Sequence, residues 1–540
     1  MNLLRAVFTV SGMTLASRVT GLVRESVKAV VFGAGPAMDA FEAAFRLPTL
    51  LRRLFAEGAF SQAFVPILAE YRRARGDGET RDLASRVATL LAVVLLVVTV
   101  AGVLAAPWLV YLLAGAFARE PAKATLTADL IRIVFPYILF VSLTSLAGGV
   151  LNVHRRFAVP AFTPVLLNLS MIAAAIFVAP HVDPPVLALA WGVFAGGVAQ
   201  LALQIAPLAR IGMLPRPRFD WRHEGVRRVL RNMAPAIVGV SAAQISILVN
   251  TQLAASLGDG RIAWISYADR LMEFPSALLG AAVGTVLLPT LARHGGVGDE
   301  VRYSSLLDWG LKLVLLLSVP AAIALWLLAL PLVATLYQYG RFSAVDALAT
   351  RTALIGYSVG LVGIVSVKIL APGFYARQDL KTPARIAVIA VVVMATLALL
   401  LMRTPLGHAG LTLATSTGAL FNATVLLVLL RRRRRYVPGP GWPAFLAKIA
   451  VAGGVLAAVL VAVTGPASVW LDASLAARVV RLGLIVIAGA AAYFGALALL
   501  GFRPRDFSRR EDLPAQASPG EPDACGSVRL VRPMLRGGTD

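Results

Sequence analysis

The sequence is poor in charge and almost free of cysteine. Charged residues make up 15% of its 540 positions, compared with about 25% in an average soluble domain. The single cysteine, Cys525, excludes a disulfide within one chain and a cysteine-based metal site. The five histidines are scattered, without H-E-x-x-H spacing, and no nucleophile–base pair stands out. The sequence therefore predicts no metal, no cofactor and no enzyme activity.

Hydrophobic residues, by contrast, make up 58% of the chain. They form long uninterrupted runs such as Leu90–Leu113, Leu313–Leu336 and Ile386–Met402, which suit a hydrocarbon layer about 30 Å thick. Within lipid the backbone must bond to itself, which leaves helices or closed barrels. Barrel strands alternate apolar and polar residues, whereas these runs do not. The sequence therefore predicts an all-α polytopic membrane protein.

About fourteen spans are expected, at roughly 20 residues each. Their estimated bounds are 8–31, 38–70, 85–114, 129–152, 160–179, 186–207, 229–257, 262–292, 307–336, 347–375, 384–402, 409–430, 443–464 and 479–501. The net charge of +23 is concentrated in every second loop, Arg431–Arg435 for example. Because loops on the cytoplasmic side carry excess Lys and Arg, this pattern indicates membrane topology rather than nucleic-acid binding. It predicts that both termini are cytoplasmic.

A weak internal repeat divides the chain. Ala44–Leu47, followed by Pro66–Ala69, is similar to Ala268–Leu271, followed by Pro289–Ala292, about 224 residues later. Such repeats are typical of transporters, whose substrate sites lie at the repeat interface. The predicted units are a six-helix lobe at 1–225, a parallel six-helix lobe at 226–435, two additional helices at 436–502, and a disordered cytoplasmic tail at 503–540.

Charged residues inside the expected spans mark the candidate site. An Arg at the centre of a membrane helix costs about 2.5–3.5 kcal/mol on the insertion scale, so these residues must face one another or a water-filled cavity. In the first span, Ser17, Arg18 and Arg24 share one helical face. The other candidates are Asp39, Arg52, Arg53, Glu57, Asp269 and Arg270. An arginine-rich cavity suits an anionic ligand, phosphate above all, because the guanidinium binds two oxygens at once. Salt bridges that merely join helices are the other interpretation.

Several of these segments resemble the MurJ (MviN) family of the multidrug/oligosaccharidyl-lipid/polysaccharide (MOP) exporter superfamily. The resembling segments are Ser17–Glu25, Phe32–Gly35, Asp39–Phe41, Phe45–Pro48, Leu51–Pro66, Tyr267–Pro275 and Leu370–Tyr375. The likeness extends from Met1 to about Phe502, and the stretch from Arg52 to Pro66 is its most specific part.

The resemblance implies a flippase that moves lipid II across the bacterial inner membrane for cell-wall synthesis by alternating access. Lipid II is a disaccharide-pentapeptide joined through pyrophosphate to undecaprenol. The resemblance also implies a V-shaped central cavity, a groove for the lipid tail at the two additional helices, and membrane lipids and cell-wall synthesis proteins as partners. By motif match the cavity residues are Ser17, Arg18, Arg24, Asp39, Arg52 and Arg270, with Arg24, Arg52 and Arg270 on the pyrophosphate.

One departure from the family concerns sodium. Some members use a sodium site with acidic ligands on late second-lobe helices, whereas 384–402 and 409–430 contain no Asp or Glu here, which argues against sodium coupling. Three alternatives stay open. A related exporter of a drug or of another polyprenyl-linked glycan is one. A membrane-bound glycosyltransferase or acyltransferase would need a catalytic His or carboxylate pair, and a scaffold would leave the arginines unexplained.

Overall fold

The structure, a computed structural model, describes the backbone of residues 3–52, 59–294 and 300–502. Within these ranges it describes the side chains apart from those of 3–11, 59, 62, 234–243, 280–290 and 292–294. All regular structure in this part of the chain is helical. The first half comprises α1 (Leu3–Phe32), α2 (Pro36–Arg52), α3 (Ala59–Leu104), α4 (Ala106–Ala114), η2 (Gly115–Arg119), α5 (Pro121–Val134), α6 (Tyr137–Val153), α7 (Ala158–Ala173), η3 (Ala174–Val178), η4 (Ala179–His181) and α8 (Leu187–Arg210). The second half comprises α9 (Glu224–Ala255), α10 (Arg261–His294), α11 (Glu300–Leu327), α12 (Ala329–Tyr337), α13 (Ala344–Ser358), α14 (Leu361–Tyr375), α15 (Lys381–Leu401), α16 (His408–Arg432), α17 (Trp442–Thr464), α18 (Ser468–Leu471) and α19 (Leu475–Leu499).

The prediction of an all-α polytopic membrane protein is confirmed. In the part of the chain that the structure describes, nine helices are long and apolar enough to cross a membrane, or up to ten if the bent pair α13 and α14 forms one span. Helices also cover most of the described residues in the other four expected spans, 8–31, 38–70, 229–257 and 262–292, but each of these spans includes residues or side chains that the structure does not describe. The total of about fourteen therefore stays a prediction.

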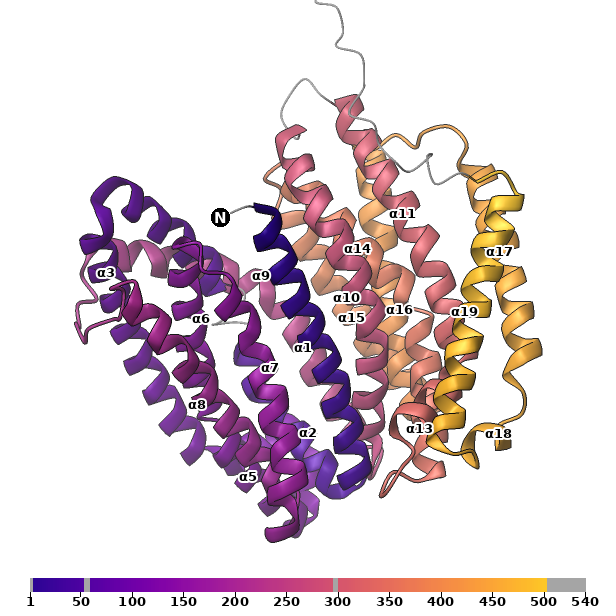
Figure 1. Ribbon diagram of the computed structural model, residues 1–540, viewed down its shortest axis with the longest axis horizontal. Helices are drawn as coiled ribbons and strands as arrows, with labels where there is room; N and C mark the ends of the chain where they lie inside the picture. The colour runs from indigo at the N-terminus through magenta and orange to yellow at the C-terminus, as the bar shows by residue number, and fades with distance from the viewer. Residues whose placement is uncertain (1–2, 53–58, 295–299, 503–540) are drawn as a thin grey trace, which may run out of the picture.

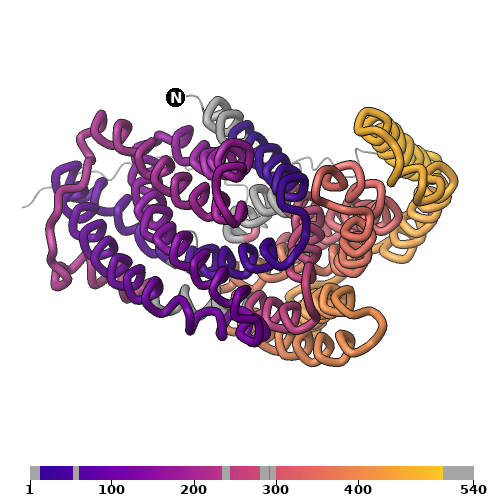
Figure 2. The backbone as a smooth tube through the Cα atoms, turned by 90° about the horizontal axis from the view of Figure 1, so that it is seen from below, coloured from indigo at the N-terminus to yellow at the C-terminus, as the bar shows by residue number. Residues whose placement is uncertain are grey.

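The helices form two neighbouring bundles with a separate pair beside the second (Figures 1 and 2). Helices α1 to α8 lie on one side, and most of α9 to α16 lie on the other. The pair α17 and α19 packs on the outer side of α11 and α12 around buried Phe445, Trp470 and Tyr493. The two bundles diverge toward the end that holds the N-terminus and converge at the opposite end (Figure 1).

Two local features add detail to the expected spans. The expected spans 38–70 and 85–114 are separated by a sharp kink within α3 at Gly76, whose φ of 80° is in the region that favours glycine. Pro48 lies inside α2, which runs through it to Arg52. Proline is tolerated in membrane helices because neighbouring groups satisfy the freed backbone. Arg52 therefore stays on the same helix as the rest of α2.

Candidate functional site

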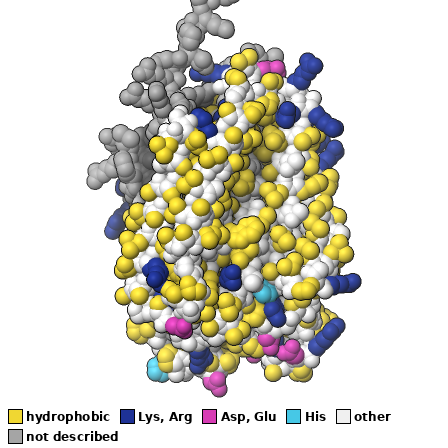
Figure 3. All heavy atoms as spheres, turned by 90° about the vertical axis from the view of Figure 1, so that its right-hand side faces the viewer, with side chains coloured by type: hydrophobic (Ala, Val, Ile, Leu, Met, Phe, Trp, Pro, Cys, Tyr) yellow, Lys and Arg dark blue, Asp and Glu magenta, His cyan; other side chains and the backbone are white. Residues whose placement is uncertain are grey.

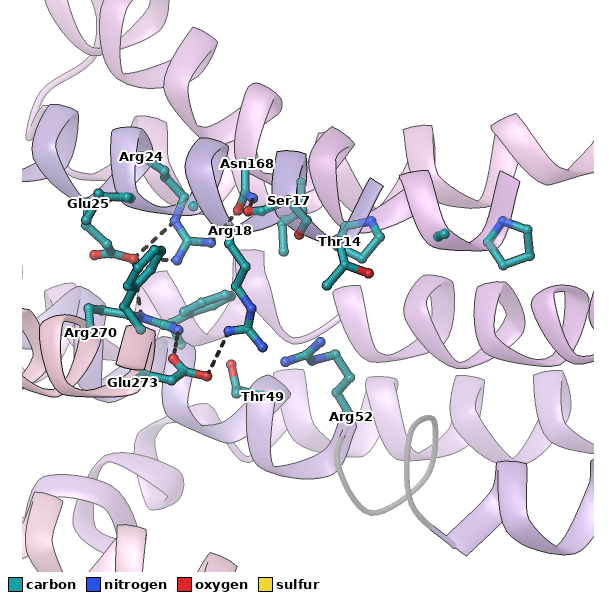
Figure 4. A pocket seen from close by; sticks show the side chains of 18 of the residues that line it. Thr14, Ser17, Arg18, Arg24, Glu25, Thr49, Arg52, Asn168, Arg270 and Glu273 are labelled. Carbon is teal, nitrogen blue, oxygen red and sulfur yellow. Dashed lines mark hydrogen bonds and ion pairs between the residues drawn. The ribbon is translucent and has the colours of Figure 1, made fainter. Parts of the chain in front are cut away.

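The candidate site is a cavity of about 650 Å³ at the junction of the two bundles. Helices α1, α2, α6 and α7 of the first bundle form most of its wall, and α10 of the second bundle closes it. Its polar lining consists of Thr14, Ser17, Arg18, Arg24, Glu25, Thr49, Arg52, Tyr137, Asn152, Asn168, Arg270 and Glu273. Figure 4 labels all of these except Tyr137 and Asn152. It is the kind of concave, polar space that a charged headgroup requires.

Helix α1 divides its surface as the sequence predicts. Ser17, Arg18 and Arg24 of the polar face line the cavity, whereas Leu15 and Val19 on the other face are 58% and 51% exposed. Apolar side chains exposed on the outer surface of a membrane helix are expected to contact lipid. The apolar Leu22 lines the cavity as well. The charged residues of α1 are therefore directed inward, which avoids most of their insertion cost.

Arg24 is fixed by two neighbours. It is 7% exposed, and its Nη1 donates to Oδ1 of Asn168 on α7 at 2.9 Å. Its Nε donates to Oε1 of Glu25 at 3.2 Å. The amide nitrogen of Asn168 donates in turn to the carbonyl of Ser17 at 3.1 Å. The guanidinium is thus pre-positioned at the cavity wall, which lowers the cost of ordering it around a ligand.

Arg270 on α10, in the second bundle, contacts two carboxylates that also contact arginines of α1. Its Nε lies 3.5 Å from Oε1 of Glu25 on α1, and its Nη1 donates to Oε2 of Glu273 at 2.8 Å. The other oxygen of Glu273 lies 3.4 Å from Nη1 of Arg18 (Figure 4). Two glutamates therefore link arginines from both bundles, so part of this cluster joins helices as the salt-bridge interpretation expects.

A buried ion network lies beside the cavity. Lys28 on α1 bonds Glu25 at 2.7 Å and Glu42 on α2 at 2.5 Å. The second oxygen of Glu42 accepts from the hydroxyl of Ser266 on α10 at 2.6 Å. Buried charges require such partners, because an unpaired one is strongly destabilising. The network joins α1, α2 and α10 next to Arg24 and Arg270.

The lining retains an excess of positive charge. Four arginines (Arg18, Arg24, Arg52 and Arg270) face two glutamates (Glu25 and Glu273), a formal excess of two. Arginine side chains with partly satisfied donors can exchange carboxylate oxygens for phosphate oxygens of the same geometry. The arrangement therefore suits a ligand with two negative charges.

The other predicted site residues are placed differently. Arg52 lines the cavity, and its side chain extends toward Arg18 (Figure 4). Arg53 and Glu57 lie outside the described residues, and Asp269 is not in the lining.

Asp39 lies away from the cavity and fully buried. Its carboxylate accepts from the backbone N–H of Gly260 at 2.6 Å and of Ala263 at 2.9 Å, at the start of α10. The structure therefore corrects the expectation that Asp39 lines the cavity. It caps α10 instead, because a carboxylate satisfies the free N–H groups of a helix start.

Asn168 is the residue that reasoning from charge overlooks. It is buried at 6% exposure and contacts Arg24 directly. Its signal in the sequence is an isolated amide within the apolar segment Pro164–Ala175. Such an amide in a membrane helix needs a partner, and here the partner is the cavity arginine.

Comparisons with known proteins agree with this geometry. A family profile described as "Lipid II flippase MurJ" matches residues 28–480. The chain is 48% identical over 520 residues to the lipid II flippase MurJ of Burkholderia cenocepacia, which covers 94% of this chain and 100% of that protein. It is 39% identical over 514 residues to the probable lipid II flippase MurJ of Vibrio cholerae, covering 94% of this chain and 97% of that protein.

Solved structures agree on the fold. A structure described as "Lipid II flippase MurJ, inward closed conformation" matches with a TM-score of 0.76 at 22% identity, over 93% of this chain and 99% of that one. An inward-facing multidrug resistance MATE transporter of the MOP superfamily matches with a TM-score of 0.65 at 16% identity, over 77% and 94%. A family profile that matches most of the chain and near relatives of full length lead to one conclusion: the chain belongs to the MurJ family of lipid II flippases.

Proposed function

We propose that this protein carries lipid II from the cytoplasmic to the periplasmic leaflet of the bacterial inner membrane by alternating access. The observation that supports the proposal is the convergence of four arginines from α1, α2 and α10 on one cavity with two carboxylates. A diphosphate diester carries two negative charges, which equals the formal excess of the lining. Full-length relatives that bear the lipid II flippase name give independent support.

In this proposal Arg24, Arg52 and Arg270 bind the pyrophosphate, and Ser17 and Arg18 contribute neighbouring polar contacts. Arg53 and Glu57 follow Arg52 in the sequence and stay candidates, as does Asp269. Asp39 acts instead through the α10 cap. The glutamates hold the arginines apart from one another while the cavity is empty, and phosphate oxygens replace them when substrate arrives. No covalent bond changes during the cycle.

The proposed motion is a rocking of two lobes, residues 1–225 and 226–435. The undecaprenyl tail stays in lipid near the additional helices of 436–502. The orientation follows the positive-inside rule, with both termini in the cytoplasm. Figure 1 supports it in one respect, since the N-terminus and the end of α19 lie at the same end of the molecule. Partners of the cell-wall synthesis machinery would then meet the protein from that side or from the periplasm.

The membrane potential supplies a driving force for the return step. A charge that crosses the full potential gains about 2.3 kcal/mol per 100 mV. An empty cavity with two excess positive charges is drawn toward the negative, cytoplasmic side. A cavity whose excess is neutralised by pyrophosphate is not, so the potential favours resetting of the empty protein.

Depletion with complementation tests this function. The native protein is depleted, and wild type, Arg24→Ala, Arg52→Ala or Arg270→Ala is supplied in its place. Lipid II exposed on the periplasmic face is then measured, normalised to the amount of protein in the membrane. Each cavity variant is expected to lose most of the exposure, whereas Arg231→Ala, an exposed arginine outside the cavity, keeps it. Persistent exposure without the protein would contradict lipid II as substrate and favour another polyprenyl-linked glycan or a drug.

A further inference from the structure

A second pocket, with charged residues in its lining, lies between α11 and α17, apart from the central cavity. Its volume is about 1000 Å³, and it shares no lining residue with the first cavity. Its basic residues are Lys312 on α11, Arg434 in the loop before α17, and Lys448 on α17. Its acidic residues are Glu300 and Asp308. The lining thus has a formal excess of one positive charge.

The pocket wall is held in place by Asp308, which is 7% exposed. Its Oδ1 accepts from the hydroxyl of Tyr436 at 2.8 Å, from the N–H of Gly439 at 3.1 Å and from the indole N–H of Trp442 at 2.6 Å. Its Oδ2 lies 2.8 Å from Nζ of Lys312. Burial, and then the bond to Asp308, raise the pKa of Tyr436, so the hydroxyl remains a donor. One carboxylate therefore orders the whole loop between α16 and α17.

Glycine at 439 permits that close approach. A Cβ at this position would lie 3.0 Å from Oδ2 of Asp308, tighter than an ordinary contact. Ser304 on α11 adds a second tie, because its hydroxyl donates to the carbonyl of Val437 at 3.0 Å and accepts from the N–H of Val437 at 2.9 Å. The pocket is therefore a built feature of the fold rather than a gap beside a loose loop.

Two cations of the pocket have no carboxylate partner in the part of the chain that the structure describes. Among the residues that the structure describes, no Asp or Glu forms an ion pair with Arg434 or Lys448, whereas Lys312 is neutralised by Asp308. Lys448 belongs to a candidate membrane span that starts at Trp442. At 1.5 Å per residue it lies roughly 9 Å along the helix from that start. An unpaired lysine at this depth is stabilised by reaching the phosphate level of the bilayer.

An apolar track continues from the basic pocket. Val451 and Val455 follow Lys448 at i+3 and i+7, on the same face of α17. They are 53% and 39% exposed. Figure 3 views this side of the molecule, where hydrophobic side chains cover much of the surface and Lys and Arg gather toward its upper and lower edges. A charged pocket above an apolar track matches a headgroup above acyl chains.

We propose that the pocket between α11 and α17 binds the headgroup of an anionic glycerophospholipid, whose phosphate contacts Lys448 and Arg434 and whose acyl chain lies along Val451 and Val455. The single excess positive charge of the lining matches the single negative charge of a lipid such as phosphatidylglycerol. Basic pockets between membrane helices on the cytoplasmic side are suited to acidic headgroups. The assignment to the inner leaflet rests on the orientation given under Proposed function, whereas the binding itself does not.

Native mass spectrometry of the full-length protein in detergent tests the site. Phosphatidylglycerol or phosphatidylcholine is titrated into wild type and into the double variant Lys448→Gln, Arg434→Gln. The expected result is preferential binding of one phosphatidylglycerol to wild type, weakened roughly thirtyfold in the double variant. The matched control is Lys381→Gln, Arg385→Gln, which removes two exposed cations at the start of α15 and is expected to bind as wild type does.

Any of three outcomes would contradict the proposal. Equal binding of both lipids would remove the requirement for an anion, and unchanged binding by the double variant would place the lipid elsewhere. Displacement of phosphatidylglycerol by millimolar inorganic phosphate would identify a site for a free anion rather than for a lipid. Arg24→Ala and Arg270→Ala are run in parallel with lipid II, and they are expected to lose lipid II and to keep phosphatidylglycerol. Failure at one site is thereby distinguished from failure at the other.

Discussion

Arg24 on α1 and Asn168 on α7 form a hydrogen bond of 2.9 Å at the wall of the central cavity. The amide group of Asn168 is itself held by two acceptors on α1, the carbonyl of Ser17 and the hydroxyl of Thr20, each at 3.1 Å. Its oxygen is thus directed at Arg24 and its nitrogen at α1. The guanidinium therefore has a fixed direction before any ligand arrives.

Asn168→Ala is expected to lower the periplasmic exposure of lipid II about tenfold, the factor that corresponds to ~1.4 kcal/mol. The reason is that Arg24 loses the acceptor that orients it and is drawn toward Glu25. The measurement is the depletion assay, with exposure normalised to membrane protein. The matched control is Asn152→Ala, since Asn152 lines the same cavity without bonding Arg24. Equal losses in both variants would mean that Asn168 acts through packing alone.

Glu273→Gln is expected to bind lipid II up to about fivefold more tightly and to release it more slowly. Glu273 bonds Arg270 and lies 3.4 Å from Arg18. Loss of its charge raises the formal excess of the lining from two to three. Affinity in detergent and steady-state exposure in cells are both measured, with Glu70→Gln, 52% exposed and outside the cavity, as control. Weaker binding by Glu273→Gln would show that this glutamate positions the arginines for the substrate.

The sequence predicts the fold well because membrane insertion constrains it so strongly. Uninterrupted apolar runs predict helices, and the cost of burying Arg18 and Arg24 predicts that they face inward. Each of the expected spans falls on helix in the described part of the chain. The sequence predicts a break between the spans 38–70 and 85–114 but not the form of that break. The basic residues there do not reveal whether a loop or a single residue with positive φ, as at Gly76, separates the helices.

The site is predicted less completely, for a physical reason. Insertion cost identifies charged residues but says nothing about their partners. Asn168 is neutral and escapes this criterion, although it orients Arg24. Asp39 meets the criterion, yet its cost is offset by two backbone N–H groups of α10 rather than by the cavity. Pairing across bundles depends on tertiary geometry that one sequence does not contain.

Asp39→Asn is expected to destabilise the protein while leaving lipid II affinity in detergent unchanged. The amide presents one acceptor where the carboxylate presents two, so a buried N–H at the start of α10 loses its partner, at a cost of about 1–3 kcal/mol. The measurement is the midpoint of thermal unfolding together with lipid II binding. Asp129→Asn removes a carboxylate that is 47% exposed and pairs with Arg132, itself 44% exposed, so it is the control and is expected to change the midpoint little. Lost affinity at an unchanged midpoint would return Asp39 to the substrate site.

Gly33 and Gly340 meet where the two bundles converge. Gly33 follows α1 with φ 69°, and Gly340 follows α12 with φ 57°. The N–H of Arg341 donates to the carbonyl of Val30 at 2.9 Å. A Cβ at Gly340 would lie 2.4 Å from that same carbonyl oxygen, and a Cβ at Gly33 would lie 2.7 Å from the carbonyl oxygen of Arg341. Because the added Cβ would clash with backbone atoms in both cases, no flexible side chain can move to relieve the clash. Contact between the bundles at this end therefore requires both glycines.

Gly340→Ala is therefore expected to open the convergent end of the bundles. Opening is measured as the rate at which a membrane-impermeant maleimide labels Ala29→Cys, in a chain whose single natural cysteine is replaced by Cys525→Ser. Position 29 suits the probe because Ala29 is fully buried and directly precedes Val30, so a thiol there reacts only when this end opens. Labelling is expected to rise about tenfold, because a clash worth more than ~1.4 kcal/mol shifts the population by that factor. The control is Gly407→Ala, which has a positive φ of 49° but no neighbour within 4 Å of the added Cβ. Gly407→Ala imposes a similar backbone strain without the contact. An equal rise in labelling in both variants would therefore attribute the effect to strain, and it would contradict the inference that the two glycines allow the bundles to close at this end.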